Sequence, residues 1–181
     1  DIQADLAAKL IKANLQVLIF NQRSIEEILE VILTIGRIVA AEDKAQKLVD
    51  SYKKQLDKCR ENSDKIQNKP KIYFEEWDDP TFSGIRWVSE LIEIAGGEDI
   101  FANKSHGKLA MEREIQWSDV IEKNPDVILA SWCGKPVDID SIKKREGWNQ
   151  ITAIKNNRIH EIDSSIILPV SYTHLRAHET S

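Results

Sequence analysis

The chain has 181 residues, of which 41% are hydrophobic and 30% charged, and its formal net charge is −5. This composition is typical of one globular domain or slightly more, and its acidic balance and scattered basic residues argue against nucleic-acid binding. No apolar run reaches the roughly 18 residues that a membrane span needs. The two cysteines, Cys59 and Cys133, form neither a metal pattern nor a disulfide framework, so cysteine usage leaves the redox compartment open.

The first residues predict one helix and one strand. Residues 2–13 carry apolar side chains at helical spacing, and the apolar run 15–20 is predicted to be a strand. One helix and one strand cannot bury their own apolar faces. We therefore expect residues 1–23 to be the end of a domain that begins upstream.

The stretch from Ser24 to Gln67 has no proline and a single glycine. Ser24 and Glu27 match a capping box, and apolar residues follow at helical spacing. As one helix this stretch would extend roughly 65 Å at about 1.5 Å per residue, which is longer than a domain of this size is wide. We predict a backbone helix that joins two lobes, either whole or broken near residues 40–43. The alternative is two ordinary helices of one bundle.

Residues 68–168 alternate between predicted strands and helices. Three strands are expected, at residues 71–77, 126–131 and 158–162. Helices are expected at residues 85–95, 118–124, 138–145 and 148–154. Apolar strands separated by helices indicate an α/β fold, in which a parallel sheet carries helices on both faces.

Residues 169–181 resemble a translated sequencing adapter that is read in frame with the preceding sequence. We expect this stretch to be a non-native tail and exclude it from the fold. His174 and His178 have the i, i+4 spacing of a helical metal site, but no third ligand lies near them in the sequence. No metal site is therefore predicted.

The candidate binding residues follow the predicted strands, because ligands of open parallel sheets bind outside the carboxyl ends of the strands. That rule selects the loops 77–84, 132–135 and 163–165. Trp77 and Trp132 are expected to be exposed and to stack on a large flat ligand, although they could instead pack beneath their own loops. The candidate ligand-binding residues are Trp77, Asp78, Phe82, Ser83, Trp132, Cys133, Ser164 and Ser165.

An acidic run at the end of the first strand offers a second kind of site. Glu75, Glu76, Asp78 and Asp79 could hold a cation or act as an acid/base pair. Strand alternation sends Glu75 and Glu76 to opposite faces, so at most one of them joins Asp78. A solvated charge run at the end of a strand is the simpler interpretation.

Cys133 is a weaker candidate for catalysis. A cysteine nucleophile needs a positioned base, and no motif links His106 or His160 to Cys133.

Five motifs occur in the order in which a known family carries them. They are GGEDIF at 96–101, NPDVI at 124–128, the stretch from Trp148 to Ile159, FEEWDDP at 74–80 and SWCGK at 131–135. Together they resemble the C-terminal lobe of the helical-backbone substrate-binding proteins, which serve ABC importers for cobalamin, siderophores and haem. The last two motifs are most similar to the cobalamin-binding branch. The resemblance extends from residue 1 to about residue 168.

This resemblance implies two α/β lobes that are joined by the backbone helix, with one ligand in the cleft between them. Most of the N-terminal lobe and the last helix of the C-terminal lobe would then lie outside this chain. Trp77, Phe82 and Trp132 would form the wall of the cleft, and Ser83, Ser164 and Ser165 would supply hydrogen bonds.

The implied function is non-enzymatic. The protein would bind cobalamin, or another corrinoid, and deliver it to an ABC permease dimer at the membrane surface. A siderophore or haem is the alternative ligand. The alternative from another class is an α/β enzyme half-domain that uses Cys133, or Glu76 with Asp78. The resemblance further implies an extracytoplasmic monomer without a cofactor or a resident metal.

In this family, a glutamate on each lobe docks onto arginines of the permease. Here Ser118 stands where that glutamate usually lies, with Asp119 beside it. The resemblance therefore implies docking through Ser118 and Asp119, with a departure from the family pattern at Ser118.

Overall fold

The structure is a computed structural model, and it describes residues 2–167. The adapter-like stretch 169–181, with His174 and His178, lies outside the described residues. The elements in chain order are α1 (Ile2–Lys12), α2 (Ile25–Ile38), α3 (Glu42–Ser63), β1 (Lys71–Asp78), β2 (Thr81–Ser83), α4 (Arg86–Ile94), β3 (Glu98–Asp99), η1 (Ala110–Arg113), α5 (Trp117–Lys123), β4 (Val127–Ala130), α6 (Ile139–Lys143), η2 (Trp148–Gln150), α7 (Thr152–Lys155), β5 (Ile159–Glu161) and α8 (Ser164–Ile167).

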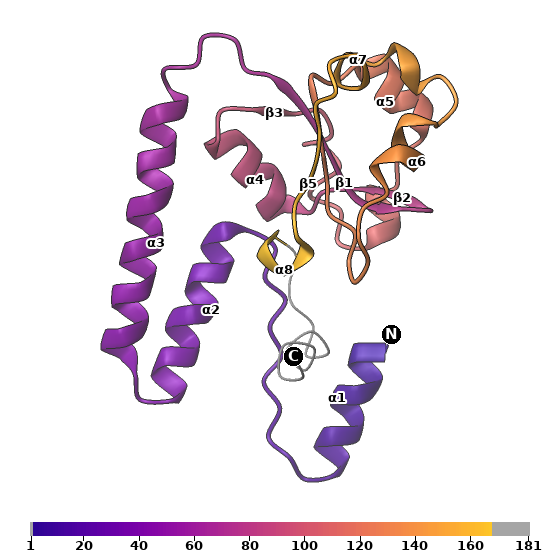
Figure 1. The fold of residues 1–181 in the computed structure, drawn as a ribbon. Coiled ribbons are helices and arrows are strands. Elements are labelled where there is room, and N and C mark those ends of the chain that lie inside the picture. Colours follow the sequence, from indigo (N-terminus) through magenta and orange to yellow (C-terminus); the bar gives the residue numbers. More distant parts are fainter. Residues whose placement is uncertain (1, 168–181) are drawn as a thin grey trace, which may run out of the picture.

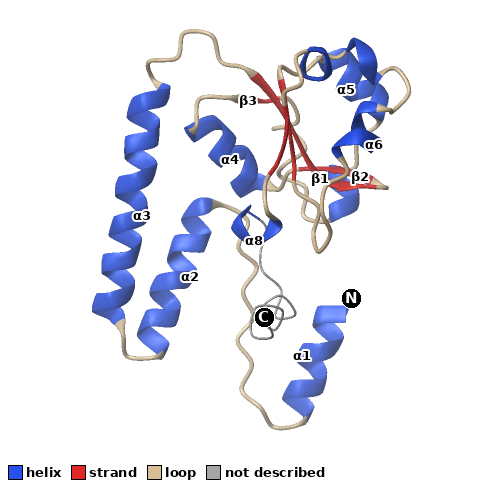
Figure 2. Cartoon of the chain, viewed as in Figure 1, coloured by secondary structure: helices blue, strands red, loops and turns tan. Residues whose placement is uncertain are grey.

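The sheet is built around β1 (Figures 1 and 2). β4 pairs parallel with β1, and β5 pairs parallel with β4. On its other edge, β1 pairs parallel with β3 near its start and antiparallel with β2 near its end. The predicted parallel sheet is confirmed, but the interpretation of 77–84 as a loop is wrong, because this stretch contains β2.

Helices cover both faces of the sheet, as predicted. Tyr73 faces a core that includes Trp148 of η2, and its neighbour Phe74 faces a core that includes Val88 of α4. Ile25 of α2 packs at the edge of the second core. Because consecutive strand residues point to opposite faces, the buried run in β1 supplies both cores.

The stretch predicted as a backbone helix, either whole or broken near residues 40–43, forms two helices that lie side by side (Figure 1). α2 ends at Ile38 and α3 begins at Glu42, so the break lies at the edge of the predicted 40–43 position. Ala40 adopts a left-handed conformation there, with φ 53°. Of the two forms predicted, the structure therefore has the broken one, and α3 alone extends about 33 Å. The capping box of Ser24 and Glu27 is confirmed.

The predicted strand at residues 15–20 is also wrong. These residues form neither helix nor strand, and Leu15, Leu18 and Ile19 are between 56% and 65% exposed. A strand is stable only beside a partner, and within residues 2–167 the sheet offers this segment none. α1 and this segment extend away from the sheet in Figure 1.

The strands and helices predicted after residue 84 lie within a few residues of observed elements, except that the segment predicted at 148–154 is divided into η2 and α7. The short elements β3, η1 and α8 were not predicted. Among residues 2–167, no helix combines the length and the apolar character that crossing a membrane requires.

Candidate ligand-binding site

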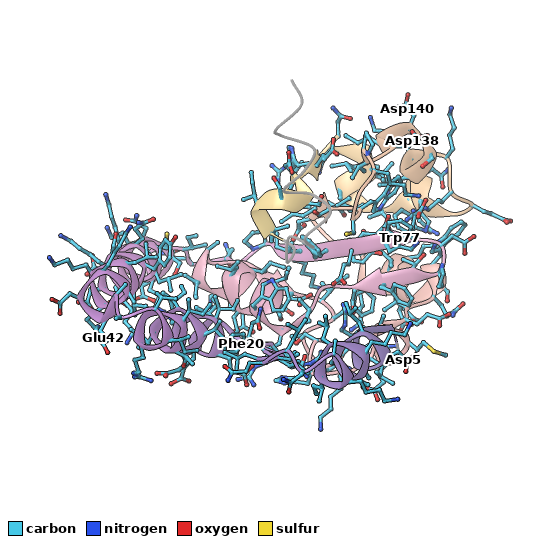
Figure 3. The ribbon with its side chains drawn as sticks, turned by 90° about the horizontal axis from the view of Figure 1, so that it is seen from below. Asp5, Phe20, Glu42, Trp77, Asp138 and Asp140 are labelled. Atoms are coloured by element: carbon cyan, nitrogen blue, oxygen red, sulfur yellow. The ribbon has the colours of Figure 1, made fainter. Side chains whose placement is uncertain are left out.

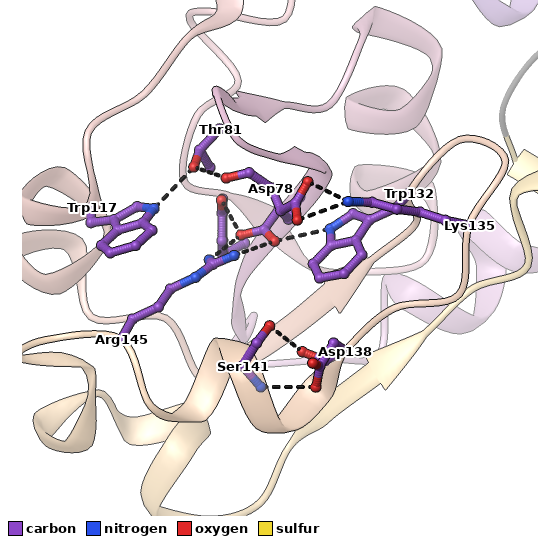
Figure 4. A network of polar contacts seen from close by, with 10 residues as sticks. Asp78, Thr81, Trp117, Trp132, Lys135, Asp138, Ser141 and Arg145 are labelled. Atoms are coloured by element: carbon purple, nitrogen blue, oxygen red, sulfur yellow. Dashed lines mark hydrogen bonds and ion pairs between the residues drawn. The ribbon is translucent and has the colours of Figure 1, made fainter.

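The carboxyl ends of β1 and β4 lie side by side, and one cation joins them. The Lys135 ammonium donates to both carboxylate oxygens of Asp78 at 2.9 Å (Figure 4). The same nitrogen lies 4.5 Å from the ring centroid of Trp77 and 4.8 Å from that of Trp132. The structure therefore brings together two of the three loops selected from the sequence, and places a lysine between their tryptophans.

The two tryptophans differ in exposure. Trp132 is only 3% exposed, and its Nε1 donates to Glu75 at 3.0 Å, so the expectation that it is exposed is wrong. Trp77 is half-buried, and its Nε1 donates to the carbonyl of Asp79 at 3.1 Å. In Figure 3, Trp77 lies at the end of β1, far from Glu42 at the start of α3. Trp77 is thus more accessible than Trp132 at this edge of the sheet, and Trp117, at the start of α5, is 41% exposed.

Glu75 is fully buried, which corrects the interpretation of the acidic run as solvated. Both terminal nitrogens of Arg145 donate to its carboxylate, one of them at 2.9 Å, and the Tyr73 hydroxyl donates to it at 2.9 Å. Burial, and then the negative charge of Glu75, raise the pKa of Tyr73 well above its ordinary value of 10.0. The charge of Glu75 is tolerated because hydrogen-bond donors surround it.

Arg145 continues this network toward α5. Its guanidinium carbon lies 5.0 Å from the ring centroid of Trp117 and 4.5 Å from that of Trp148. Trp117 Nε1 donates to the Thr81 hydroxyl at 2.9 Å, and that hydroxyl donates to the carbonyl of Asp78 at 2.7 Å. Figure 4 shows these contacts linking the end of β1 to the start of α5.

Glu76 pairs with a different arginine. Arg113 donates to the two carboxylate oxygens of Glu76 at 2.6 and 3.0 Å, and also to the carbonyl of Ser83. Ser83 is 2% exposed, and its hydroxyl donates to the Arg113 carbonyl at 3.1 Å. The two glutamates therefore have separate partners, in agreement with their predicted opposite directions. Glu76 and Asp78, considered together as an acid/base pair, are each engaged in an ion pair.

The remaining candidates lie in three different environments. Phe82 is half-buried on β2, where it pairs with Trp77. Cys133 is exposed with a free thiol. Ser164 is half-buried and Ser165 is exposed, and both belong to the first turn of α8, so the loop predicted at 163–165 is partly helical. Within residues 2–167, no group of three or more His, Cys, Asp or Glu side chains is arranged to hold a metal ion.

A hollow of about 360 Å³ adjoins the end of β1. It is lined by the turn between β1 and β2 and by the start of α5, with Asp78, Asp79, Pro80, Thr81, Glu114, Ile115, Gln116, Trp117 and Ser118. A larger hollow, of about 730 Å³, lies between α2, α3 and α4, away from the strand ends. The predicted site therefore does not coincide with this larger hollow.

The two candidate docking residues lie at the start of α5, which begins one residue before the predicted position. Ser118 is exposed. Asp119 is half-buried, and its carboxylate accepts from the backbone N–H of Gln116 at 3.4 Å. Asp119 thus caps its own helix, while the Ser118 side chain faces solvent.

Residues 1–166 match the family model described as "Periplasmic binding protein". This chain belongs to the periplasmic binding protein family. Members of this family are the substrate-binding components of ABC transporters, and the resemblance inferred from the five motifs is confirmed.

One curated relative of this periplasmic binding protein is the uncharacterized ABC transporter substrate-binding lipoprotein YvrC of Bacillus subtilis (strain 168). It is 27% identical over 170 residues. The alignment covers 91% of this chain and 52% of the relative, so the chain spans about half the length of the curated relative that it matches.

Solved structures share the fold. A possible iron-binding, periplasmic solute-binding protein from Staphylococcus epidermidis is 23% identical with a TM-score of 0.75, over 98% of this chain and 71% of that one. The periplasmic vitamin B12 binding protein of Vibrio cholerae is 18% identical with a TM-score of 0.65, over 97% of this chain and 67% of that one. Other similar structures include haem-binding proteins and a member of an Fe3+-hydroxamate transport system.

Sequence reasoning about this periplasmic binding protein missed the cations of the site. Arg113 lies 37 residues from Glu76, and Arg145 lies 70 residues from Glu75. No local sequence pattern predicts ion pairs between residues so far apart. Lys135 does have a local signal, because it lies three residues after Trp132 in the predicted loop 132–135. Its position over both indoles depends on the meeting of β1 with β4.

Proposed function

We propose that this periplasmic binding protein binds a corrinoid of the cobalamin type and delivers it to the permease of an ABC importer. The observation that carries the proposal is the half-buried Trp77 indole at the carboxyl edge of the sheet, which is held between its own turn and Lys135. A large, mostly apolar ring system gains most from a fixed aromatic side chain at such an edge.

The charges at this edge favour a corrinoid over haem. Lys135, Arg113 and Arg145 pair with Asp78, Glu76 and Glu75, respectively. Haem carries propionate groups that need cationic partners, and using these cations would leave the carboxylates unpaired. A corrin ring carries neutral amide groups, which can hydrogen-bond to the polar atoms at this edge without breaking an ion pair.

Delivery of the ligand implies a protein partner, the permease, and a cellular location for this protein. We propose that the permease dimer contacts the start of α5 around Ser118 and Asp119, and that the protein works as a monomer outside the cytoplasm. The family and the lipoprotein description of the curated relative support this location. Binding and release require no covalent chemistry.

The test is ligand binding by a form of the protein that includes both lobes of its relatives. Cobalamin, haem and a ferric hydroxamate are titrated separately, and tryptophan fluorescence and ligand absorbance are recorded. We expect saturable quenching at micromolar cobalamin and weaker binding of the other two. Tighter binding of haem or of the hydroxamate would replace the corrinoid assignment by that ligand.

Two variants of one position test the site. Trp77→Ala should weaken cobalamin binding by about tenfold, because the stacking surface is lost. Trp77→Phe keeps an aromatic face and should retain most of the affinity. Equal affinities for the two variants and the wild type would remove Trp77 from the site.

A further inference from the structure

We propose that Lys135 is a positioning residue that fixes the Trp77 indole in the orientation in which it meets the ligand. The proposal rests on the proposed function, because it assigns a role in the same site. In this role, Lys135 holds the Trp77 side chain in place and does not itself contact the ligand.

Trp77 needs such support because the backbone around it is irregular. The pairing between β1 and β2 shifts register between Glu75 and Trp77, so the regular ladder is interrupted just before this indole. The Trp77 ring has one hydrogen bond, to Asp79 of its own turn. That bond lies within the turn, and the ring also packs against the edge of the core that contains Trp132 and Trp148.

Trp132, the other indole that Lys135 contacts, is buried and hydrogen-bonded. It is 3% exposed, and its Nε1 is bonded to Glu75, which is in turn held by Arg145. Lys135 extends from the same loop, and its ammonium lies over both indoles. Lys135 therefore connects the buried Trp132 to the half-buried Trp77.

The ion pair to Asp78 completes this connection. Asp78 follows Trp77 directly, so a bond from Lys135 to both of its carboxylate oxygens restrains the backbone that carries the indole. The Lys135 and Asp78 side chains are 41% and 28% exposed. Such an exposed pair adds little to global stability, so its loss should free the indole without unfolding the protein.

The test compares three lysine variants, with and without ligand. Lys135→Met removes the ammonium but keeps the chain length, and Lys135→Arg restores a cation that can pair with Asp78 and lie over an indole. Lys144→Met is the matched control, because Lys144 is also an exposed lysine and lies after α6. Each variant is also made with Trp77→Phe, so that the difference spectrum reports Trp77 alone.

Without ligand, Lys135→Met should reduce the near-UV circular dichroism of Trp77 and increase its quenching by acrylamide. High salt should do the same to the wild type, because it screens the exposed pair. With cobalamin, Lys135→Met should weaken binding roughly fivefold, which corresponds to the loss of one exposed cation–aromatic contact. Lys135→Arg should recover most of both signals, and Lys144→Met should change neither.

The outcomes separate this proposal from the proposed function. If Trp77 is freed but the wild type binds no cobalamin, the function fails and the positioning role stands. If the affinity falls while the Trp77 signal is unchanged, Lys135 contacts the ligand itself and the positioning role is overturned. If Lys135→Met does not fold, Asp78→Asn breaks the same pair from the other side. An unchanged Trp77 signal in Asp78→Asn would then overturn the proposal.

Discussion

Glu75 lies where an isolated carboxylate would be very costly, in the middle of β1 and without exposure to solvent. Its cost is offset by the donors of Arg145, Tyr73 and Trp132. Arg145 is in turn covered by Trp117 and Trp148. Every member of this network depends on its neighbours, so the network ties the end of the sheet to α5 and η2.

At the residue scale, this network predicts a loss of stability at alkaline pH. The pKa of Tyr73 is raised in the folded protein, whereas the unfolded chain keeps the ordinary value of 10.0. Above that pH the unfolded state loses the phenolic proton and the folded state retains it. The free energy of unfolding should therefore fall as pH rises above 10.0, by up to about 1.4 kcal/mol per pH unit from this group.

Urea denaturation between about pH 9 and pH 11.5 measures this effect. Tyr73→Phe has no proton to lose, so its stability should decline less steeply over that range. Tyr52→Phe is the control, because Tyr52 is 42% exposed on α3 and should follow the wild type. A Tyr73→Phe profile parallel to that of the wild type would contradict the prediction.

At the scale of elements, the helical hairpin depends on one close contact. A Cβ atom at Gly36 of α2 would lie 2.4 Å from the Cβ of Ala45 on α3, so the two helices approach closely only because residue 36 has no side chain. Ala40, in the left-handed conformation, reverses the chain between them. A glycine that lowers helix propensity is therefore used to bring two helices together.

We expect Gly36→Ala to lower the free energy of unfolding by about 1 to 2 kcal/mol, although alanine is the better helix former. The clash at Ala45 outweighs the propensity gain. Gly36→Ala combined with Ala45→Gly returns the missing space and should recover most of the loss. Thermal denaturation compares these two variants with Ala45→Gly alone. A Gly36→Ala protein more stable than the wild type would show that the helices are not in close contact.

The sequence predicted elements well where the signal was local. The capping box at Ser24, the break after α2 and the buried run of β1 all depend on residues close together in the chain. The strand at 15–20 failed because a run of apolar residues specifies a strand only when a partner is available. β2 was missed because a three-residue strand contains too few residues to show an alternation.

At the scale of the whole molecule, the exits of β1 and β4 and the start of α5 form one continuous region. Trp77 and Lys135 lie on one side of it, and the exposed Ser118 on the other, with the hollow of about 360 Å³ at Ser118. The division into residues 1–23, 24–67 and 68–168 stays a prediction, as does the wider arrangement of two lobes.

A change at the proposed docking surface should weaken binding to the permease and leave ligand binding intact. Ser118→Arg would place a positive charge where we propose that the permease presents arginines, so it should reduce complex formation with the cognate importer by about tenfold through like-charge repulsion. Cobalamin affinity should change less than twofold. Lys144→Arg is the charge-conserving control. The measurement is binding to the importer in lipid nanodiscs, and unchanged complex formation would exclude this end of α5 from the interface.

The sequence by itself determined the α/β class, most helices and strands, and the family, whereas the edge of the sheet at which a ligand would bind stays a prediction. These features follow from periodicity, capping and motifs, all of which are local along the chain. Only the tertiary structure decided that Trp132 is buried, that Glu75 belongs to the core, and that Lys135 lies between two indoles. Those outcomes depend on contacts between residues up to 70 positions apart, which form only when the strands align.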